Sequence, residues 1–197
     1  MTQKEKPKKS LSREVLSWLS LLVMAVVIAL PVRAYLFEPI KVDGQSMCNT
    51  LQDGEVVIMT KPGVLLGHLN RGDVVICRFP GRSKSTTIKL GAVLDIETVG
   101  STLFVKRLVA LPGDAVAVQD GLLYVNDALV DEDYVDYPSW ADYPRQVLGE
   151  DEYMVMGDNR ASSHDSRARD VGPITRDMIV GHASLVVLPL DQIRVIR

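Results

Sequence analysis

The sequence predicts a mainly β protein, an antiparallel β-sheet or β-barrel-like domain, tethered by one N-terminal transmembrane helix. Two observations lead to this prediction. Residues 15–32 form a run of 18 residues without a charge, which is long enough for a helix that crosses a membrane. After residue 40 no long helical period occurs, and short β-branched runs alternate with Gly, Pro and Asp, as strands and turns do.

Length and charge narrow the class of protein further. A chain of 197 residues, 47% hydrophobic and 24% charged, suits one sizeable folded domain plus an appendage rather than a disordered chain. Residues 1–13 hold five basic residues and one acidic residue, a net charge of +4, while the remaining 17 basic and 24 acidic residues give −7. The acidic main body argues against nucleic acid as a partner, and the basic tail suits anionic membrane lipid.

The apolar run predicts how the chain is organised. As a helix it spans roughly 27 Å, close to the roughly 30 Å hydrocarbon core, and the apolar residues after Arg33 can supply the rest. Positive charge on its N-terminal side favours a cytoplasmic tail. We therefore expect a basic cytoplasmic tail over 1–13, a transmembrane anchor over 14–33 and an exported β-rich domain over 34–197, in the cell membrane as a single-pass protein.

Two alternatives compete with an uncleaved anchor. A cleavable signal peptide is one, because Val32-Arg33-Ala34 weakly resembles a cleavage site, but the apolar run exceeds the roughly 7–15 residues usual for the apolar region of such a peptide. A buried core helix is the other, but the run has no polar face.

The elements after the anchor are read from their composition. Strands are expected at residues 55–60, 73–79, 102–111, 115–118, 122–125, at the start of 149–173, and within 178–189. "QDG" (119–121) predicts a hairpin turn, and the rest of 149–173 predicts a polar loop. The acidic and aromatic stretch 127–144 is interpreted as an exposed excursion without the spacing of a Ca²⁺ loop.

The two cysteines, Cys48 and Cys77, match no zinc or redox spacing. A pair of small buried side chains is the favoured interpretation, and one labile bridge is the alternative. No metal or organic cofactor is predicted.

The segment around Ser46, "VDGQSMCNTL" (42–51), is the strongest candidate for a catalytic site. A serine needs a base, and none of the three histidines, His68, His164 and His182, lies in a triad-like motif. Lys106 is the other option, because on a strand it shares a face with Phe104 and Leu108. Burial would lower the pKa of a lysine, whereas a lysine whose ammonium reaches water is the alternative that these residues leave open.

A resemblance decides between these options. "GQSMCNTL" resembles the S-M-x-P-T-L nucleophile box of type I signal peptidases, particularly those of Gram-positive bacteria. Three further boxes and a short segment resemble the family: "RGDVVICRFP" (71–80), "LFVKRLVALPGD" (103–114), "GDNRASSHDSR" (157–167) and "VGPI" (171–174). The anchor, the four boxes and "VGPI" occur in family order across 15–174.

The resemblance implies roles for individual residues. Ser46 matches the nucleophile, Lys106 the general base, and Ser163 the serine that hydrogen-bonds and orients the lysine amine. Four charged residues match those that brace the site, although each could equally belong to a plain surface ion pair: Asp158, Arg107, Asp165 and Arg167. Asn159 and Arg160 are interpreted as turn residues.

Two positions depart from the family pattern. Asn49 stands where the box has Pro, so the turn loses a fixed φ. Gly44 offers no side chain where some relatives have a hydroxyl group as an oxyanion donor, so another donor is implied.

The resemblance also implies the function. We expect a membrane-bound serine endopeptidase that removes signal peptides from preproteins with small residues at −1 and −3, beside the export machinery and membrane lipid. An extended substrate would pair with an exposed strand edge, for which "VDGQS" is a candidate. A self-cleaving Ser/Lys regulator and a catalytically silent exported binding module are the alternatives.

Overall fold

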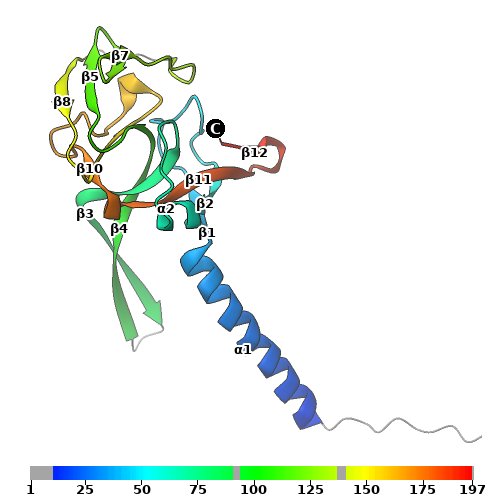
Figure 1. Cartoon of the computed structure of the whole chain (residues 1–197). Coiled ribbons are helices and arrows are strands. Elements are labelled where there is room, and N and C mark those ends of the chain that lie inside the picture. The colour runs from blue at the N-terminus through cyan, green and yellow to red at the C-terminus, as the bar shows by residue number, and fades with distance from the viewer. Residues whose placement is uncertain (1–10, 91–93, 137–140, 197) are drawn as a thin grey trace, which may run out of the picture. The chain divides into compact units, whose positions relative to one another are not determined.

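The computed structural model describes residues 11–90, 94–136 and 141–196 (Figure 1). It divides into two compact units, residues 1–37 and 38–197, each of which is described by itself. Residues 1–10, most of the predicted basic tail, lie outside the described residues.

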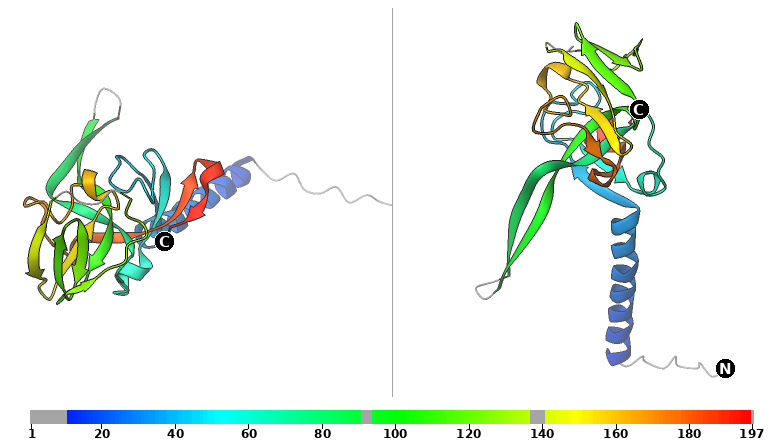
Figure 2. Two further views of the ribbon diagram at one scale, coloured as in Figure 1. Left: turned by 90° about the horizontal axis from the view of Figure 1, so that it is seen from above. Right: turned by 60° about the vertical axis from the view of Figure 1, so that its left-hand side comes forward.

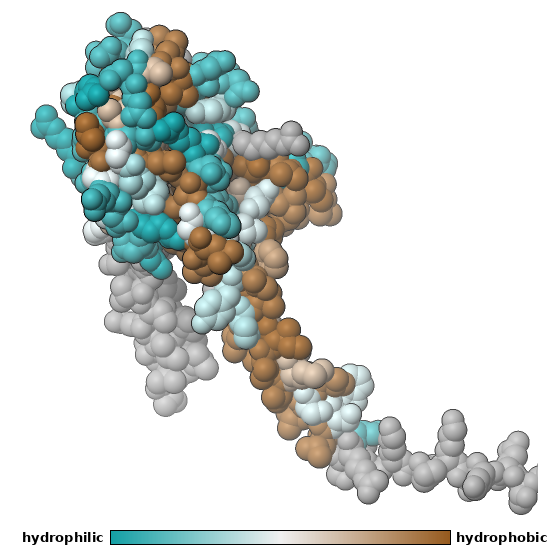
Figure 3. Space-filling view, viewed as in Figure 1, coloured by the Kyte–Doolittle hydropathy of each residue, from teal (hydrophilic) through white to brown (hydrophobic). Residues whose placement is uncertain are grey.

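The first unit is dominated by one helix, α1 (Leu11–Tyr35). Its segment Glu14–Val32 has a mean hydropathy of 2.5, and none of it is buried against other parts of the protein. Apolar residues cover the helix over most of its length (Figure 3). A helix that exposes apolar side chains on every face lacks the one-sided stripe of a helix packed on a soluble core. An apolar helix is thus present where the anchor is predicted.

The second unit is mainly antiparallel β structure, as predicted. Within the described residues the larger sheet has the order β1-β2-β11-β3-β4-β9-β10, and β12 pairs with β11. Its strands are β1 (Phe37–Lys41), β2 (Val56–Thr60), β3 (Val74–Leu90), β4 (Leu94–Ala110), β9 (Glu152–Met156), β10 (Ile174–Thr175), β11 (Ile179–Leu188) and β12 (Arg194–Val195). A short helix, α2 (Pro62–Leu65), follows β2.

A smaller sheet has the order β7-β6-β5-β8 in the described part of the chain. Its strands are β5 (Ala115–Gln119), β6 (Leu122–Val125), β7 (Ala128–Leu129) and β8 (Tyr143–Val147). The predicted hairpin turn is present, because Asp120 and Gly121 both have positive φ, at 50° and 80°. Two consecutive residues with positive φ are typical of the tight turns whose twist matches that of a hairpin.

Strand β3 separates two parts of the core. Val74 and Ile76 belong to one apolar cluster, together with Met47 of the turn after β1. Val75 and Cys77 belong to another cluster, and all four strand residues are at most 4% exposed. Successive side chains of a strand point to opposite faces, so a strand with both faces covered is apolar throughout.

Strands β3 and β4 are longer than the sequence predicts. They pair in register from Ser83↔Ser101 to Leu90↔Leu94, beyond the expected strands 73–79 and 102–111, and form a hairpin that projects from the sheet (Figure 2). Its segment 82–90, "RSKSTTIKL", lacks the apolar alternation by which a half-buried strand is recognised.

Candidate active site

Ser46 lies in a turn that is fastened to the core on both sides. The neighbouring Met47 is 2% exposed and Leu51 is fully buried. The amides of Thr50 and Leu51 both donate to the Met47 carbonyl, at 2.8 and 2.6 Å. Gly44 has a φ of +100°, a left-handed conformation that favours glycine, which explains why this position carries no side chain. The turn therefore holds the half-buried Ser46 hydroxyl in one place.

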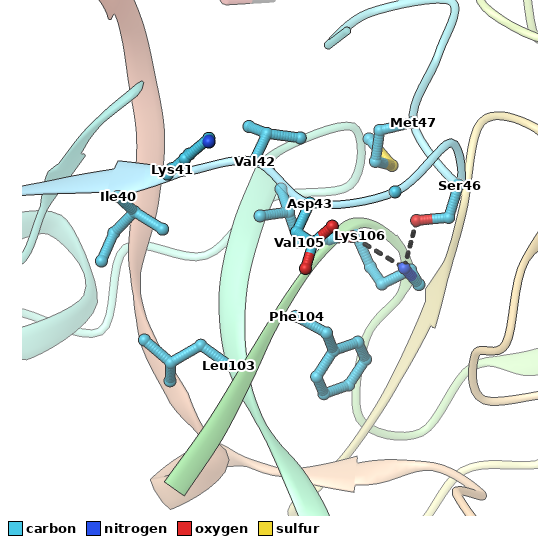
Figure 4. Close-up of a pocket in the computed structure, with 11 residues that line it drawn as sticks. Ile40, Lys41, Val42, Asp43, Ser46, Met47, Leu103, Phe104, Val105 and Lys106 are labelled. Carbon is cyan, nitrogen blue, oxygen red and sulfur yellow. Dashed lines mark hydrogen bonds between the residues drawn. The ribbon is translucent and has the colours of Figure 1, made fainter. Parts of the chain in front are cut away.

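Lys106 lies on β4 opposite Val75 of β3, and it is only 4% exposed. Its Nζ lies 2.6 Å from Ser46 Oγ and 2.9 Å from the Val105 carbonyl oxygen (Figure 4). The Phe104 ring, two residues earlier on the strand, has its centroid 5.4 Å from Nζ. The alternative of a lysine that extends into water is therefore wrong, and the predicted apolar setting is present.

Burial sets the protonation of this amine. It lowers the pKa of Lys106 from 10.5 to about 8, although the negative charge of Asp165 opposes the shift. A charged ammonium loses its hydration in such a place, so the neutral form gains relative weight. The amine is thus available as a base near neutral pH.

Arg107, the residue after Lys106 on β4, forms a buried ion pair with Asp158. Arg107 Nε and Nη2 donate to the two carboxylate oxygens of Asp158, both at 2.8 Å, and the side chains are 3% and 0% exposed. Thr50, four residues after Ser46, donates to Asp158 at 2.5 Å and accepts from Arg107 at 3.1 Å. The pair therefore connects β4 to the turn that carries Ser46.

Asp165 and Arg167 form a second such pair. Arg167 donates to both carboxylate oxygens at 2.8 Å, and the Gly157 amide donates to Asp165 at 3.0 Å. Burial alone would raise the pKa of Asp165, but the hydrogen bonds and charge of Arg167 outweigh it and the pKa is lowered. With Asp165 at 1% and Arg167 at 13% side-chain exposure, neither pair is the surface ion pair that the sequence leaves open.

Ser163 does not make the hydrogen bond that the resemblance implies. Its Oγ is buried and makes no hydrogen bond to Lys106; it lies near Asp165, whose pKa it helps to lower. Ser163 nevertheless lies close to the nucleophile, because a Cβ on Gly157 would collide with both Ser163 Oγ and the Ser46 carbonyl oxygen. Gly157 thus allows the two serine-bearing segments to approach each other.

Sequence reasoning missed the contacts of Asn159 and Arg160, which it interprets as turn residues. The Asn159 amide donates to the Ser46 carbonyl at 3.1 Å, and its side chain donates to the Gln45 carbonyl at 3.2 Å. Arg160 is 3% exposed and forms an ion pair with Glu132. Their places in the "GDNR" box are the one signal that could have indicated these contacts.

A small cavity of about 110 Å³ opens beside Ser46 and Lys106 (Figure 4). Its walls come from the end of β1 with the segment that follows it, and from residues 103–106 of β4. The lining residues are Ile40, Lys41, Val42, Asp43, Gly44, Ser46, Met47, Leu103, Phe104, Val105 and Lys106. Its lining is partly apolar and partly polar, and its small volume limits it to a small side chain.

Among the described residues, neither His164 nor His182 hydrogen-bonds Ser46 or Lys106, whereas Cys48 lies in the Ser46 turn itself, where Asn159 Nδ2 contacts its Sγ at 3.4 Å. His164 contacts Asp170 and His182 contacts Asp73. Both cysteines are free; Cys77 is buried, and Cys48 is half-buried. In the part of the chain that the structure describes, no cluster of His, Cys, Asp or Glu is suited to a metal ion.

A β domain in which a buried lysine amine contacts a serine hydroxyl defines a class, the serine hydrolases that have lysine in place of histidine. The profile of the family described as signal peptidase, peptidase S26, matches residues 15–188. The chain therefore belongs to the signal peptidase family.

Comparison with individual proteins gives signal peptidases as well. The chain is 35% identical to signal peptidase I of Bacillus licheniformis, with 98% of each chain covered. It is 34% identical to signal peptidase I T of Bacillus subtilis (strain 168), over 98% of this chain and 95% of that one. A solved signal peptidase I from Enterococcus faecalis V583 matches 58% of this chain and 95% of its own, with a TM-score of 0.41 and 24% identity. The family match and the two Bacillus relatives identify the protein as a membrane-anchored serine endopeptidase that removes signal peptides from preproteins.

Proposed function

We propose that Ser46 is the nucleophile of this signal peptidase and that Lys106 is its general base. The observation that supports the proposal is the 2.6 Å separation of Lys106 Nζ from Ser46 Oγ, which is within reach of direct proton transfer. A serine hydroxyl is a weak nucleophile until a neighbouring base removes its proton, and a buried amine with a pKa of about 8 can do so.

The chemistry proceeds in two stages. The Ser46 hydroxyl donates its proton to the neutral Lys106 amine as Oγ attacks the scissile carbonyl carbon. The resulting ammonium returns that proton to the leaving amine nitrogen as the peptide bond breaks, which leaves an acyl-enzyme on Oγ. Water then attacks the ester carbonyl, with Lys106 accepting its proton, and the released Oγ is protonated again.

The Ser46 amide is the proposed oxyanion donor. Among the described residues this N–H has no acceptor, so it is free to donate to the negative charge that develops on the carbonyl oxygen. Gly44 contributes no side chain, and a water molecule or another backbone N–H is proposed as the second donor.

The charged residues act as braces in this proposal. Arg107 and Asp158 hold β4 against the Ser46 turn through Thr50, while Asp165 and Arg167 fix the loop that starts at Gly157. Ser163 is proposed to orient the Lys106 amine during turnover, because its buried hydroxyl lies beside the Ser46 carbonyl across Gly157.

The substrate is proposed to bind as an extended strand with small residues at −1 and −3. In the described residues β1 is an outer strand, and β4 pairs with β9 only from Arg107 onward, which leaves the edge of 103–105 open. The small cavity between these segments cannot receive a large side chain, because an added group that does not fit is penalised.

We further propose that the N-terminus is cytoplasmic and that residues 34–197 lie outside the cell membrane. The basic tail before α1 favours this orientation and contact with anionic lipid. Substrates would arrive from the export machinery, held by their own apolar helices.

Cleavage of a preprotein by the full-length chain in detergent micelles tests the assignment. Ser46→Ala and Lys106→Ala are expected to leave the precursor intact, whereas the matched controls Ser162→Ala and Lys61→Ala cleave it normally. Normal cleavage by either dyad variant would contradict the proposal. An intact precursor with the wild type would favour a silent binding module, and cleavage of its own chain alone a self-cleaving regulator.

A further inference from the structure

One segment of the acidic stretch is not the solvated excursion that the sequence suggests. Residues 130–136 leave the small sheet after β7 and remain tied to it, since the Val130 amide donates to the Leu123 carbonyl at 2.9 Å. From there the 130–136 segment contacts the loop after β9, the Ser46 turn and β4, through Glu132 and Tyr134.

Glu132 fastens the segment by a buried ion pair. Arg160 donates to both carboxylate oxygens of Glu132, at 2.7 Å for Nη1. The Glu132 side chain is 8% exposed and the Arg160 side chain 1%. Arg160 also donates from Nε to the Gly157 carbonyl at 3.0 Å, and Tyr134 donates its hydroxyl to Glu132 at 2.7 Å. Removing one member of such a pair leaves the other charge buried without its counter-ion, so breaking this attachment is costly.

Tyr134 brings the segment to both sides of the proposed dyad. Its carbonyl oxygen accepts from Asn49 Nδ2 at 2.9 Å, three residues after Ser46. Its ring lies over the Arg107 guanidinium, with 3.9 Å from Cζ to the ring centroid, one residue after Lys106. One residue of the segment thus touches the turn of the nucleophile and the strand of the base.

Asn49 is the position at which this chain departs from the family box, which has Pro there. A proline would fix φ through its ring, whereas asparagine leaves φ free unless another contact restrains it. Here the side-chain amide supplies that contact, to a carbonyl 85 residues away in sequence.

Two features of the backbone at Asn49 are compatible with a proline. Its φ is not positive, and among the described residues its own N–H donates to nothing, so a ring at this nitrogen would remove no hydrogen bond. The side-chain contact and the ring are therefore alternative restraints at the same site.

We propose that the 130–136 segment positions the Ser46 turn through the Asn49 side chain, and that this hydrogen bond replaces the restraint of the family proline. Asn49 and Tyr134 are positioning residues, because they act on the dyad only through its neighbours. The inference rests on the proposed function of Ser46 and adds an element that the signal peptidase boxes do not contain.

The test compares three variants of the full-length chain in detergent micelles, with a preprotein peptide as the substrate. Asn49→Ala is expected to lower kcat about tenfold or more, since small misplacements of a nucleophile are costly, with KM changed less than about threefold. Asn49→Pro is expected to keep at least about half of the wild-type kcat. Glu132→Gln, which weakens the attachment, is expected to lower kcat in the wild type but much less in the Asn49→Pro background.

Controls separate positioning from stability. Asp133→Asn changes a neighbouring exposed carboxylate and is expected to leave kcat unchanged, and thermal unfolding of each variant reports its folded fraction. If the Glu132→Gln variant is unfolded, the comparison of Asn49→Ala with Asn49→Pro by itself tests the inference, because both of these variants keep the buried ion pair.

Two results would overturn the inference: Asn49→Ala with a kcat within twofold of the wild type, or Asn49→Pro as impaired as Asn49→Ala. An equal effect of Glu132→Gln in both backgrounds would overturn it as well. A Ser46→Ala variant that still cleaves would instead refute the proposed function, so the two failures are distinguishable.

Discussion

Raising the pH from 7 to 9 is expected to increase kcat/KM of the wild-type enzyme about tenfold, because the proposed base acts only when it is neutral. With a pKa of about 8, roughly 9% of the Lys106 amine is neutral at pH 7 and roughly 91% at pH 9. Above pH 9 the rate should level off. An exposed lysine with a pKa of about 10.4 would instead gain about tenfold per pH unit up to pH 10.

The size of this shift follows from competing contributions around the amine. Burial lowers the pKa of Lys106, the carboxylates of Asp165 and Asp158 raise it, and the positive charge of Arg167 lowers it. Lowering the pKa from 10.5 to about 8 corresponds to roughly 3 kcal/mol of differential stability between the two protonation states.

The assay follows cleavage of a peptide without groups that titrate between pH 6 and 10, by the full-length chain in detergent micelles. Lys106→Arg serves as the control, since a guanidinium stays protonated, and it should be inactive at every pH. Samples returned to pH 8 must recover full activity, which excludes denaturation. A rate that is flat between pH 6 and 9, or that still rises tenfold per unit above pH 9, would refute the reasoning.

Three further perturbations test the site. Lys106→Met is expected to stabilise the fold at pH 7 by up to about 3 kcal/mol, measured by urea unfolding. Between pH 8 and 10.5 the Lys106 amine of the wild type is neutral in the folded state but still protonated in the unfolded state, so the stability of the wild type rises with pH and the advantage of the variant should disappear across that range. Asp158→Ala removes the carboxylate counter-ion of the buried Arg107 and should lower the free energy of unfolding by about 3–5 kcal/mol, measured in the same way. Gly157→Ala should reduce kcat about a hundredfold, because its methyl group collides with the Ser46 carbonyl, whereas Gly149→Ala makes only ordinary contacts and should not.

Features that depend on local pattern could be predicted from the sequence. The apolar helix follows from 18 uncharged residues, and most strands from β-branched runs between turn residues. The face of Lys106 follows from strand alternation alone, and Phe104 and Leu108 do lie in one apolar cluster of the structure. The same physics left the protonation of the amine open, because alternation says which side a residue faces and not how deeply that side is covered.

Features that depend on long-range contacts could not be predicted. Glu132 and Tyr134 look like members of a solvated acidic stretch, and nothing local indicates that Arg160 and Asn49 are their partners. The projecting part of β3 and β4 lacks an apolar period, so its pairing is visible only in the register of the two strands. A buried ion pair can be predicted only when the positions of both partners in the fold are known, and the spacing of two residues in the sequence does not give their distance in space.

The way in which two buried carboxylates, Asp158 and Asp165, are paired with arginines helps to explain why the Lys106 amine can be neutral. Each carboxylate by itself would favour the ammonium, since an opposite charge within a few ångströms raises the pKa of a lysine. Asp158 and Asp165, however, each carry a guanidinium on both oxygens, at 2.8 Å in every contact. Because an ion pair presents little net charge to a third group, the field at the amine is weak and burial decides the sign of the shift. The arginines thus support the base without touching it, by neutralising the acids that would otherwise keep it charged.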